Sequence, residues 1–393
     1  MFETLKQPAP DKILTLIALL RDDPRPNKVD LGVGVYKDRE GRTPIMQSVR
    51  EAEQVLFAEQ TTKTYLGLAG DTTFDTLMTG LVLGDAAPAA RVRAIQTPGG
   101  SGALRILFDL LHRAKPDATV WVSDPTWPNH VPMIEASGLA HASYPYFDAT
   151  TGTVRFEAML AALAQAKPND VVLLHGCCHN PTGANLTFEQ WRAVGRLLLE
   201  KNLFPFVDIA YQGFGEGLDA DAAGVRLLAA LVPAMCVATS CSKNFSVYRD
   251  RVGCAILLAP SAAEADLACS QLGSVARANY SMPPDHGAAA VRIILGDPAR
   301  RAAWTVEVDA IRARMIALRE GLAAALRKHT GTERFDFVAR HRGMFSRLGL
   351  SVEQVHRLRA EHAIYMVEDS RVNVAGLPDD RLDDVAHAIV AVL

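Results

Sequence analysis

Short apolar runs alternate with helical patterns along most of the chain, and this alternation restricts the folds that it can adopt. The runs occupy residues 92–96, 120–122, 171–174, 204–207, 235–239 and 253–258, separated by helical stretches such as 102–114 and 187–200. Strands buried on both faces read as continuous apolar runs, because the crossover helices of parallel strands cover each side of the sheet. The sequence therefore predicts an α/β fold with a largely parallel sheet sandwiched by helices.

The C-terminal portion has a different pattern. A long helical stretch at 299–329 precedes a strand-like segment at 335–338, a helix opened by Ser351-x-x-Gln354, a strand at 371–374 and a final helix. We expect a smaller α+β domain here, completed by the N-terminal segment. The predicted division is 1–45 for the N-terminal arm and first part of the small domain, 46–310 for the large domain, and 311–393 for the C-terminal small domain.

Composition narrows the possible partners and location. The formal net charge of −3 gives no electrostatic footprint for nucleic acid or an anionic membrane. The six cysteines are scattered without the spacing of a disulfide framework, which favours reduced thiols. The N-terminus has no apolar signal core, and the longest apolar stretch, near 227–238, is too short to span a bilayer. We expect a soluble cytoplasmic protein.

Lys243 follows one of the apolar runs, in the segment Ser-Cys-Ser-Lys-Asn-Phe at 240–245, and Arg251 lies eight residues further on. Hydroxyls, an amine and a guanidinium so close together can hold a phosphate and form an imine beside it. A lysine at the end of a buried strand loses solvation and deprotonates more easily, as a nucleophilic amine must. The alternative is a solvated loop lysine flanked by serines.

A glycine-rich segment, Thr-Pro-Gly-Gly-Ser-Gly at 97–102, lies between a predicted strand and a predicted helix. Glycines allow close backbone approach, and a helix N-terminus supplies free N–H groups, so the segment is a candidate phosphate cradle. Its spacing matches neither the dinucleotide fingerprint nor a Walker loop. A simple tight turn is the alternative.

Four potential metal ligands lie within the segment His-Gly-Cys-Cys-His at 175–179, which raises the possibility of a zinc site. Cys177 and Cys178 would project in opposite directions in an extended chain, and no second ligand cluster accompanies them, so we predict no metal. The following Asn-Pro-Thr-Gly at 180–183 is better interpreted as a turn that aims the Asn180 amide into a cleft.

Several other polar or aromatic residues suit a ligand site. Asp208 ends an apolar run, at the carboxyl end of a predicted parallel strand, where open α/β sheets bind ligands. The alternative is that Asp208 caps the N-terminus of a helix. Trp127 could stack on a planar ligand or simply pack in the core. Arg371 interrupts an apolar strand and needs an anionic partner, whereas Arg277 reads by default as a surface residue. Two arginines would suit a substrate with two carboxylates.

Together these segments resemble the class I aminotransferases, the fold-type-I pyridoxal-phosphate enzymes of the aspartate and aromatic amino acid branch. The resemblance runs from Gly-Val-Gly-Val-Tyr-Lys-Asp at 32–38 to Arg-Val-Asn-Val-Ala-Gly at 371–376. It implies a mostly parallel seven-stranded sheet in the large domain. It also implies an aminotransferase that works by a ping-pong mechanism through a Lys243 Schiff base with pyridoxal 5′-phosphate.

The resemblance assigns further roles. Asp208 would keep the cofactor's ring nitrogen protonated, and Tyr211 and Asn180 would bind its phenolic oxygen. Other cofactor contacts would come from Gly100, Ser101, Trp127, His130, His175, Ser240, Ser242 and Arg251, with Tyr65 supplied by a partner subunit of a homodimer. Substrate contacts would come from Gly34, Trp127, Asn180, Phe345 and Arg371, with Arg277 supplied by the partner.

Departures from the aspartate pattern concern substrate range. Thr64, Ser101 and Met282 stand where that branch usually has Asn, Thr and Asn, whereas Val35, Lys37 and Thr43 match it. Met282 is apolar and flexible, which would make the side-chain pocket more tolerant of rings; we have no physical account of Arg347-Leu348. We expect aspartate and aromatic amino acids as donors to 2-oxoglutarate. The alternatives are an aromatic-preferring aminotransferase with weak aspartate activity, a non-catalytic binding protein on this fold, and a zinc hydrolase.

Overall fold

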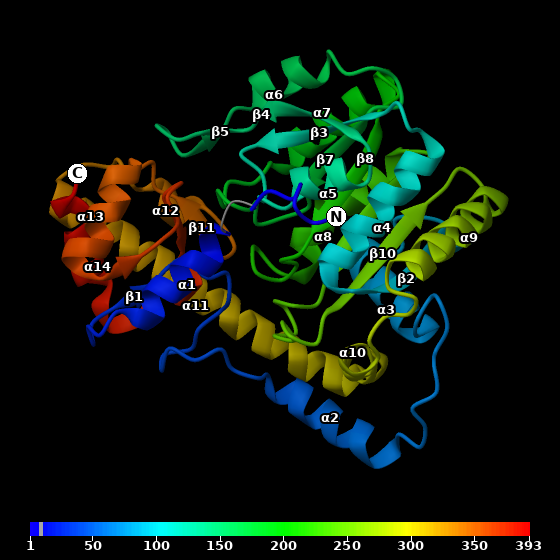
Figure 1. The fold of residues 1–393 in the computed structure, drawn as a ribbon, viewed down its shortest axis with the longest axis horizontal. Helices are drawn as coiled ribbons and strands as arrows, with labels where there is room; N and C mark the ends of the chain where they lie inside the picture. The colour runs from blue at the N-terminus through cyan, green and yellow to red at the C-terminus, as the bar shows by residue number, and fades with distance from the viewer. Residues whose placement is uncertain (8–10) are drawn as a thin grey trace.

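A computed structural model describes residues 1–7 and 11–393 (Figure 1). These residues form a large body around a seven-stranded sheet of order β2-β10-β9-β8-β7-β3-β4. Its strands are β2 (Val92–Pro98), β3 (Thr119–Asp124), β4 (Ala140–Pro145), β7 (Val171–His175), β8 (Phe204–Ile209), β9 (Met235–Ser240) and β10 (Val252–Leu258). β10 runs antiparallel to β2 and β9, and the other pairs are parallel. The mostly parallel sheet is thus confirmed.

Helices cover both faces of this sheet, which explains the continuous apolar runs. On β7, Val171 and Leu173 pack into one buried cluster, while Val172 and Leu174 pack into the cluster on the opposite face. The helices of the large body are α2 (Gln47–Glu59), α3 (Thr72–Leu83), α4 (Gly99–Ala114), α5 (His130–Ala136), α6 (Phe156–Leu163), α7 (Phe188–Glu200), α8 (Leu218–Leu231), α9 (Ala262–Asn279) and α10 (His286–Gly296). A short 3-10 turn, η1 (Ala89–Arg91), precedes β2, and β5 (Phe147–Asp148) pairs with β6 (Thr153–Val154).

The long helix α11 (Pro298–Thr330) connects the large body to a smaller lobe (Figure 1). Asp297 caps its start by accepting hydrogen bonds from two backbone N–H groups, and Gly331, with φ 67°, ends it. Met315 belongs to the core of the large body, whereas Leu318 belongs to the core of the lobe. No helix within residues 1–7 and 11–393 has both the length and the apolar character needed to cross a bilayer.

The lobe combines the two ends of the chain. β1 (Val29–Asp30) pairs in parallel with β12 (Ile364–Tyr365), and Val29 shares an apolar cluster with Val372. Its other elements are α1 (Lys12–Asp22), α12 (Phe337–Arg340), β11 (Phe345–Arg347), α13 (Val352–His362), β13 (Arg371–Asn373), η2 (Val374–Gly376), η3 (Asp379–Arg381) and α14 (Leu382–Ala391). A capping box begins α13 at Ser351 with Gln354, as predicted, and another begins α7 at Thr187 with Gln190. The domain boundaries near 45 and 310 stay a prediction.

The predicted strand at 335–338 is wrong. Phe335 and Phe337 are both buried, which imitates the alternation of a strand, but consecutive turns join this segment to α12. The backbone N–H of Val338 donates to the carbonyl of Phe335, and that of His341 donates to the carbonyl of Phe337. Both rings therefore reach the lobe core from a helical turn.

Candidate active site

A cavity of about 250 Å³ lies at the carboxyl ends of the central parallel strands. The register places His175 of β7 opposite Asp208 of β8, while Ser240 ends β9. Parallel strands collect their terminal side chains at one edge of a sheet, so residues distant in sequence meet there. Most of the residues predicted from the sequence line this cavity: Gly34, Gly100, Ser101, Trp127, His175, Asn180, Asp208, Tyr211, Ser240, Ser242, Lys243, Arg251, Phe345 and Arg371.

Asp208 lies at one end of a chain of hydrogen-bonded groups, of which His130 is buried and the others are partly buried. His130 Nε2 lies 3.0 Å from Asp208 Oδ2, and Thr126 Oγ1 lies 2.7 Å from His130 Nδ1 and 3.1 Å from His175 Nε2. With neutral imidazoles one proton arrangement satisfies every member: His175 donates to Thr126, Thr126 donates to His130, and His130 donates to Asp208. Burial, followed by the charge of His130, lowers the pKa of His175 to about 3, which keeps that ring neutral.

The Asp208 carboxyl is held in its ionised form. Burial pushes its pKa upward, but the hydrogen bond from His130, the neighbouring imidazoles and the charge of Lys243 outweigh burial, so the pKa lies below its ordinary value. The cavity therefore presents a fixed negative charge near its floor. Such a charge suits a ligand with a protonated ring nitrogen.

Lys243 faces this carboxylate from the loop after β9. Its Nζ lies 4.8 Å from the centre of the Tyr211 ring. Burial lowers the pKa of the amine to about 8; the charge of Asp208 opposes the shift and that of Arg251 adds to it. Near neutral pH an appreciable fraction of this amine is therefore unprotonated, as a nucleophile requires.

The glycine-rich segment forms the start of α4, three residues earlier than predicted, and it packs closely against Ser240 and Arg251. A Cβ on Gly100 would lie 3.0 Å from Ser240 Cβ, and one on Gly99, whose φ is +73°, would lie 2.6 Å from Arg251 Nη2. Ser240 Oγ donates to Ser242 Oγ at 3.1 Å. The site thus combines hydroxyls, a guanidinium and the first N–H groups of a helix, all of which bind phosphate.

Arg371 reaches the cavity from the lobe and is buried. Its guanidinium carbon lies 4.4 Å from the centre of the Phe345 ring, and Nη2 donates to the carbonyl of Gly32 at 2.8 Å. Within the described residues, Arg371 Nε and the nearby buried Asn180 Oδ1 have no hydrogen-bond partner. The expected anionic partner of Arg371 is thus missing from that part of the chain, which fits a carboxylate ligand.

Gly34 completes the lobe side of the cavity. A Cβ there would lie 3.1 Å from Phe345 Cζ, so a larger residue would require the ring to shift. Asn180 Nδ2 donates to Tyr211 Oη at 3.3 Å, and the Tyr211 and Phe345 rings meet edge to face at 6.1 Å. Aromatic faces and unpaired polar atoms therefore share one wall.

Three predicted residues do not line this cavity in the single chain. His130 reaches it only through its hydrogen bond to Asp208, whereas Tyr65 and Arg277 lie on the surface. Tyr65 is 88% exposed, and Arg277, in the last turn of α9, is exposed and donates to Ser281 Oγ. The family resemblance assigns Tyr65 and Arg277 to the active site of a partner subunit.

Sequence reasoning missed several residues of the site. Tyr248 lines the cavity and its Oη accepts a hydrogen bond from the backbone N–H of Tyr36; burial raises its pKa to about 12. Ile13 of α1 also lines the cavity. Thr126 joins His130 to His175. The position of Tyr248 between Lys243 and Arg251 was the one available signal.

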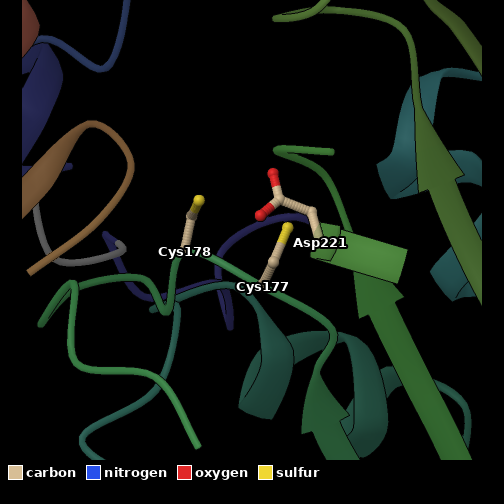
Figure 2. A group of neighbouring side chains, drawn as sticks. All are labelled: Cys177, Cys178 and Asp221. Atoms are coloured by element: carbon tan, nitrogen blue, oxygen red, sulfur yellow. The ribbon is translucent and has the colours of Figure 1, made fainter. Parts of the chain in front are cut away.

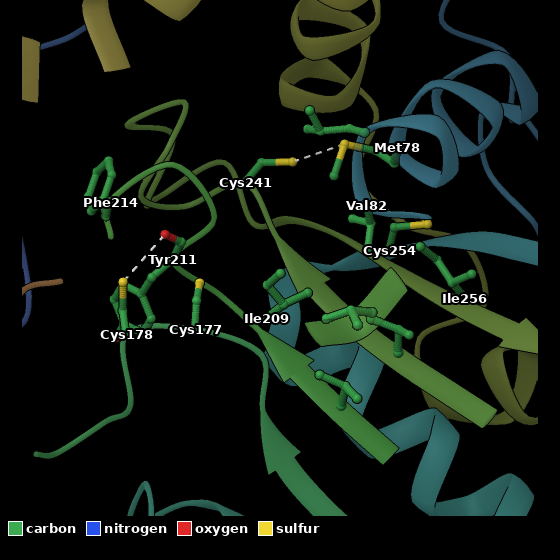
Figure 3. Packing of buried hydrophobic residues seen from close by; sticks show 14 of the residues in the cluster. Met78, Val82, Cys177, Cys178, Ile209, Tyr211, Phe214, Cys241, Cys254 and Ile256 are labelled. Atoms are coloured by element: carbon green, nitrogen blue, oxygen red, sulfur yellow. Dashed lines mark hydrogen bonds between the residues drawn. The ribbon is translucent and has the colours of Figure 1, made fainter. Parts of the chain in front are cut away.

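The expectation that Cys177 and Cys178 point apart is wrong. Cys178 has a positive φ of 49°, which turns its side chain out of the extended alternation. Its Sγ lies 3.9 Å from the carbonyl oxygen of Tyr211, and both cysteines belong to the buried cluster beside that loop (Figure 3).

Comparisons with known proteins agree with this geometry. Residues 26–389 match the family model described as aminotransferase class I and II. The aromatic-amino-acid aminotransferase of Paracoccus denitrificans is 52% identical over 392 residues, and the aspartate aminotransferase of Escherichia coli strain K12 is 44% identical over 396; the matches cover 100% of each chain. The aromatic-amino-acid aminotransferase of Burkholderia pseudomallei, solved covalently bound to pyridoxal phosphate, superposes with a TM-score of 0.97 at 44% identity, covering 100% of this chain and 99% of that one. This chain belongs to the class I and II aminotransferases, a family of pyridoxal-phosphate enzymes.

Proposed function

We propose that this aminotransferase moves the amino group of aspartate and of aromatic amino acids to 2-oxoglutarate, with Lys243 as its nucleophile. The observation that carries the proposal is the placement of three groups in one cavity: a buried amine at Lys243, an ionised carboxylate at Asp208 and a buried guanidinium at Arg371. Transamination needs an amine, a group facing the cofactor ring and an anchor for the substrate carboxylate.

The residues present fit pyridoxal 5′-phosphate. Gly99 and Gly100 leave space between α4, Ser240 and Arg251, and this cradle would hold the phosphate together with Ser101 and Ser242. Asp208 would pair with the ring nitrogen, Trp127 would cover a ring face, and Tyr211 with Asn180 would bind the phenolic oxygen. When bound, the cofactor supplies an aldehyde that condenses with amines and a ring that withdraws electrons.

The proton transfers fall to Lys243. Because burial lowers its pKa to about 8, the amine can accept a proton near neutral pH and can return it. Asp208 remains negative while this occurs, because the hydrogen bond from His130 stabilises the carboxylate. The chain through Thr126 to His175 fixes the orientation of the His130 ring.

Arg371 would bind the α-carboxylate that all amino acid substrates share. Its free Nε and the free Oδ1 of Asn180, both without partners in the described chain, mark where an incoming carboxylate and amine could bind. The Phe345 ring, whose centre lies 4.4 Å from the guanidinium carbon, helps to hold the planar guanidinium of Arg371 in its orientation.

Substrate breadth would depend on a second subunit. Arg277 would meet the distal carboxylate of aspartate or 2-oxoglutarate, while Met282 would adapt to an aromatic ring. Met282 also favours a second candidate, an aromatic-preferring aminotransferase with weak aspartate activity. The ratio of kcat/KM for aspartate and phenylalanine separates the two.

We propose a homodimer in which each active site receives Tyr65 and Arg277 from the other subunit. The surface near Tyr65 supports this assembly, because it exposes large apolar side chains that a monomer would normally bury. Phe57, in the last turn of α2, is 91% exposed, and the loop that follows exposes Tyr65, at 88%, with Leu66 and Leu68. Sedimentation at micromolar concentration tests the assembly.

Trapping the cofactor on Lys243 tests the proposal directly. Borohydride reduction of the holoenzyme followed by peptide mapping should place the label on the peptide that contains Lys243. Lys243→Ala should lose both the label and transamination, whereas Lys167→Ala, at an exposed lysine, should keep both. Turnover near wild type in Lys243→Ala, or a label on another lysine, would remove the proposed nucleophile.

A further inference from the structure

Two adjacent thiols and a distant carboxylate converge outside the catalytic set. Cys177 and Cys178 follow β7 and Asp221 lies in α8, and their ligand atoms are all within 4.8 Å of one another. Figure 2 shows both sulfur atoms and the carboxylate directed toward a common space. All three side chains are buried. Neighbouring cysteines rarely face one point, and here the positive φ of Cys178 makes this possible.

The surroundings preserve this arrangement. A Cβ on Gly343 would lie 2.8 Å from Cys178 Sγ, so the absence of a side chain there leaves space for the thiol. Asp221 Oδ2 accepts hydrogen bonds from the N–H groups of Gly213 and Gly215, and Oδ1 accepts one from Glu216. Oδ1 therefore keeps one lone pair for another partner.

Charge also favours a cation at this point. Among residues 1–7 and 11–393, no lysine, arginine or histidine forms an ion pair with Asp221, although the carboxylate is buried. Backbone N–H groups and the more distant charge of Arg312 offset part of the cost of burying this carboxylate, and a metal ion would supply a positive charge in direct contact with it. His175 and His179, the other candidate ligands in this segment, hydrogen-bond to Thr126, Ser123 and Thr182 instead.

We propose that Cys177, Cys178 and Asp221 bind a thiophilic dication such as Zn²⁺. Zinc takes thiolate sulfur at about 2.3 Å and carboxylate oxygen at about 2.0–2.2 Å in a tetrahedron, which the spacing of these three groups allows after small movements. Binding forms two Zn–S bonds and one Zn–O bond and releases one proton from each thiol to solvent, with no electron transfer. A neighbouring cavity of about 310 Å³, lined by Cys177, Asp221 and Glu216, leaves the fourth position to water.

The ion would act as a reversible inhibitor, because the site forms part of the wall of the active-site cavity. Cys177 lines that cavity, and Cys178 Sγ contacts the carbonyl of Tyr211. Drawing the thiols onto a metal would shift the backbone that carries Tyr211 and Asn180. Inhibition rests on the proposed aminotransferase function, whereas binding of the ion does not.

Titration of the chelator-treated holoenzyme with Zn²⁺ tests the site. Calorimetry in two buffers of different ionisation enthalpy should give one ion and two released protons per chain, and EDTA should restore activity. Cd²⁺ in place of Zn²⁺ should produce the ultraviolet band of two thiolate ligands. Cys178→Ala should weaken binding at least about tenfold and remove one thiolate from that band. Cys236→Ala and Cys269→Ala, outside the cluster, should bind as wild type does.

Each outcome decides the proposal. Cys177→Ala and Asp221→Asn should also weaken zinc binding, and thermal melting shows that each variant is folded. Because Cys177 lines the active-site cavity, the inhibition of Cys177→Ala is compared with the rate of the same variant without metal. Wild-type affinity in both cysteine variants, or no saturable binding by the wild type, would exclude the site. A protein that binds zinc in this way yet lacks transamination would contradict the proposed function and leave the metal site intact.

Discussion

The two halves of the active site differ in how completely their polar groups find hydrogen-bond partners within this chain. In the half proposed to bind the cofactor (the cofactor half), which comprises Gly100, Asp208, Ser240, Lys243 and Arg251, the groups are fixed by strand ends and by bonds such as that from His130 to Asp208. In the half proposed to bind the substrate (the substrate half), formed by Gly34, Phe345 and Arg371 of the lobe, Arg371 Nε has no partner in the described structure. A pre-organised half serves every substrate, and a half completed by the ligand can discriminate between substrates.

Replacing Asp208 should cause a larger loss of activity than replacing Arg371 or Arg277. Asp208→Asn removes the negative charge opposite Lys243 while keeping its size, so kcat should fall about a thousandfold, or about 4 kcal/mol, for aspartate and phenylalanine alike. Steady-state kinetics with both donors measures the loss. A matched control is Asp170→Asn, because buried Asp170 accepts bonds from Thr119 and Trp121 far from the cavity. The control should lower the melting temperature and spare kcat; equal kcat losses in both variants would contradict the assigned role.

Lys243 should reduce the stability of the cofactor-free protein. Its pKa falls from 10.5 to about 8 on folding, so at pH 7 the folded state carries a disfavoured charge worth about 3 kcal/mol. Lys243→Met should raise the free energy of unfolding by up to that amount at pH 7. Denaturant unfolding across pH measures the change.

The pH dependence of the free energy of unfolding distinguishes the effect of the Lys243 charge from an effect of better packing in Lys243→Met. Between pH 8 and 10.5 the unfolded wild type holds the Lys243 proton that the folded state has released, so wild-type stability rises with pH. The advantage of Lys243→Met should therefore shrink across this window and vanish near pH 10.5. Exposed Lys167→Met should show no such dependence. A constant advantage at all pH values would mean that the charge of Lys243 is not its source.

The central strands were predictable because their side chains are buried on both faces, as Val171–His175 illustrates. β4 was not, because Ala140–Pro145 is an edge strand with small and polar residues that pairs only with β3 within the described sheet. The segment at 335–338 failed for the opposite reason, since two buried rings imitated strand alternation. An uninterrupted apolar run therefore identifies a strand that is buried on both faces, whereas a polar edge strand and a short turn with buried rings lack a distinctive pattern.

The residues of the cofactor half were also more predictable than the residues that support them through hydrogen bonds. Lys243, Asp208 and the glycine-rich segment combine rare residue types at strand ends, which indicate chemistry by themselves. Thr126 and Tyr248 have no local pattern, because their importance arises from contacts with His130 and Tyr36 that only the fold creates. The orientation of Cys178 depends on one backbone angle that its sequence neighbours do not reveal.

In the substrate half, Arg371→Lys should affect all donors equally. Lysine keeps the charge but loses the planar fork and the stacking on Phe345, so kcat/KM should fall about thirtyfold, or about 2 kcal/mol. Aspartate and phenylalanine share the α-carboxylate, and their losses should agree within about threefold. Absorbance titration with pyridoxal phosphate should show unchanged cofactor affinity. Weaker cofactor binding would place Arg371 in the cofactor half.

Arg277→Ala should have the smallest effect and the most selective one. Aspartate presents a second carboxylate and phenylalanine does not, so kcat/KM for aspartate should fall about tenfold, whereas that for phenylalanine should change less than about threefold. The matched control is Arg301→Ala, at another exposed helical arginine, which should leave both donors unaffected. Because Arg277 lies on the surface of its own chain, the effect should also disappear in a variant that sediments as a monomer and retains phenylalanine turnover. Equal losses for the two donors would show that Arg277 does not recognise the distal carboxylate, and substrate breadth would then have to come from the lobe alone.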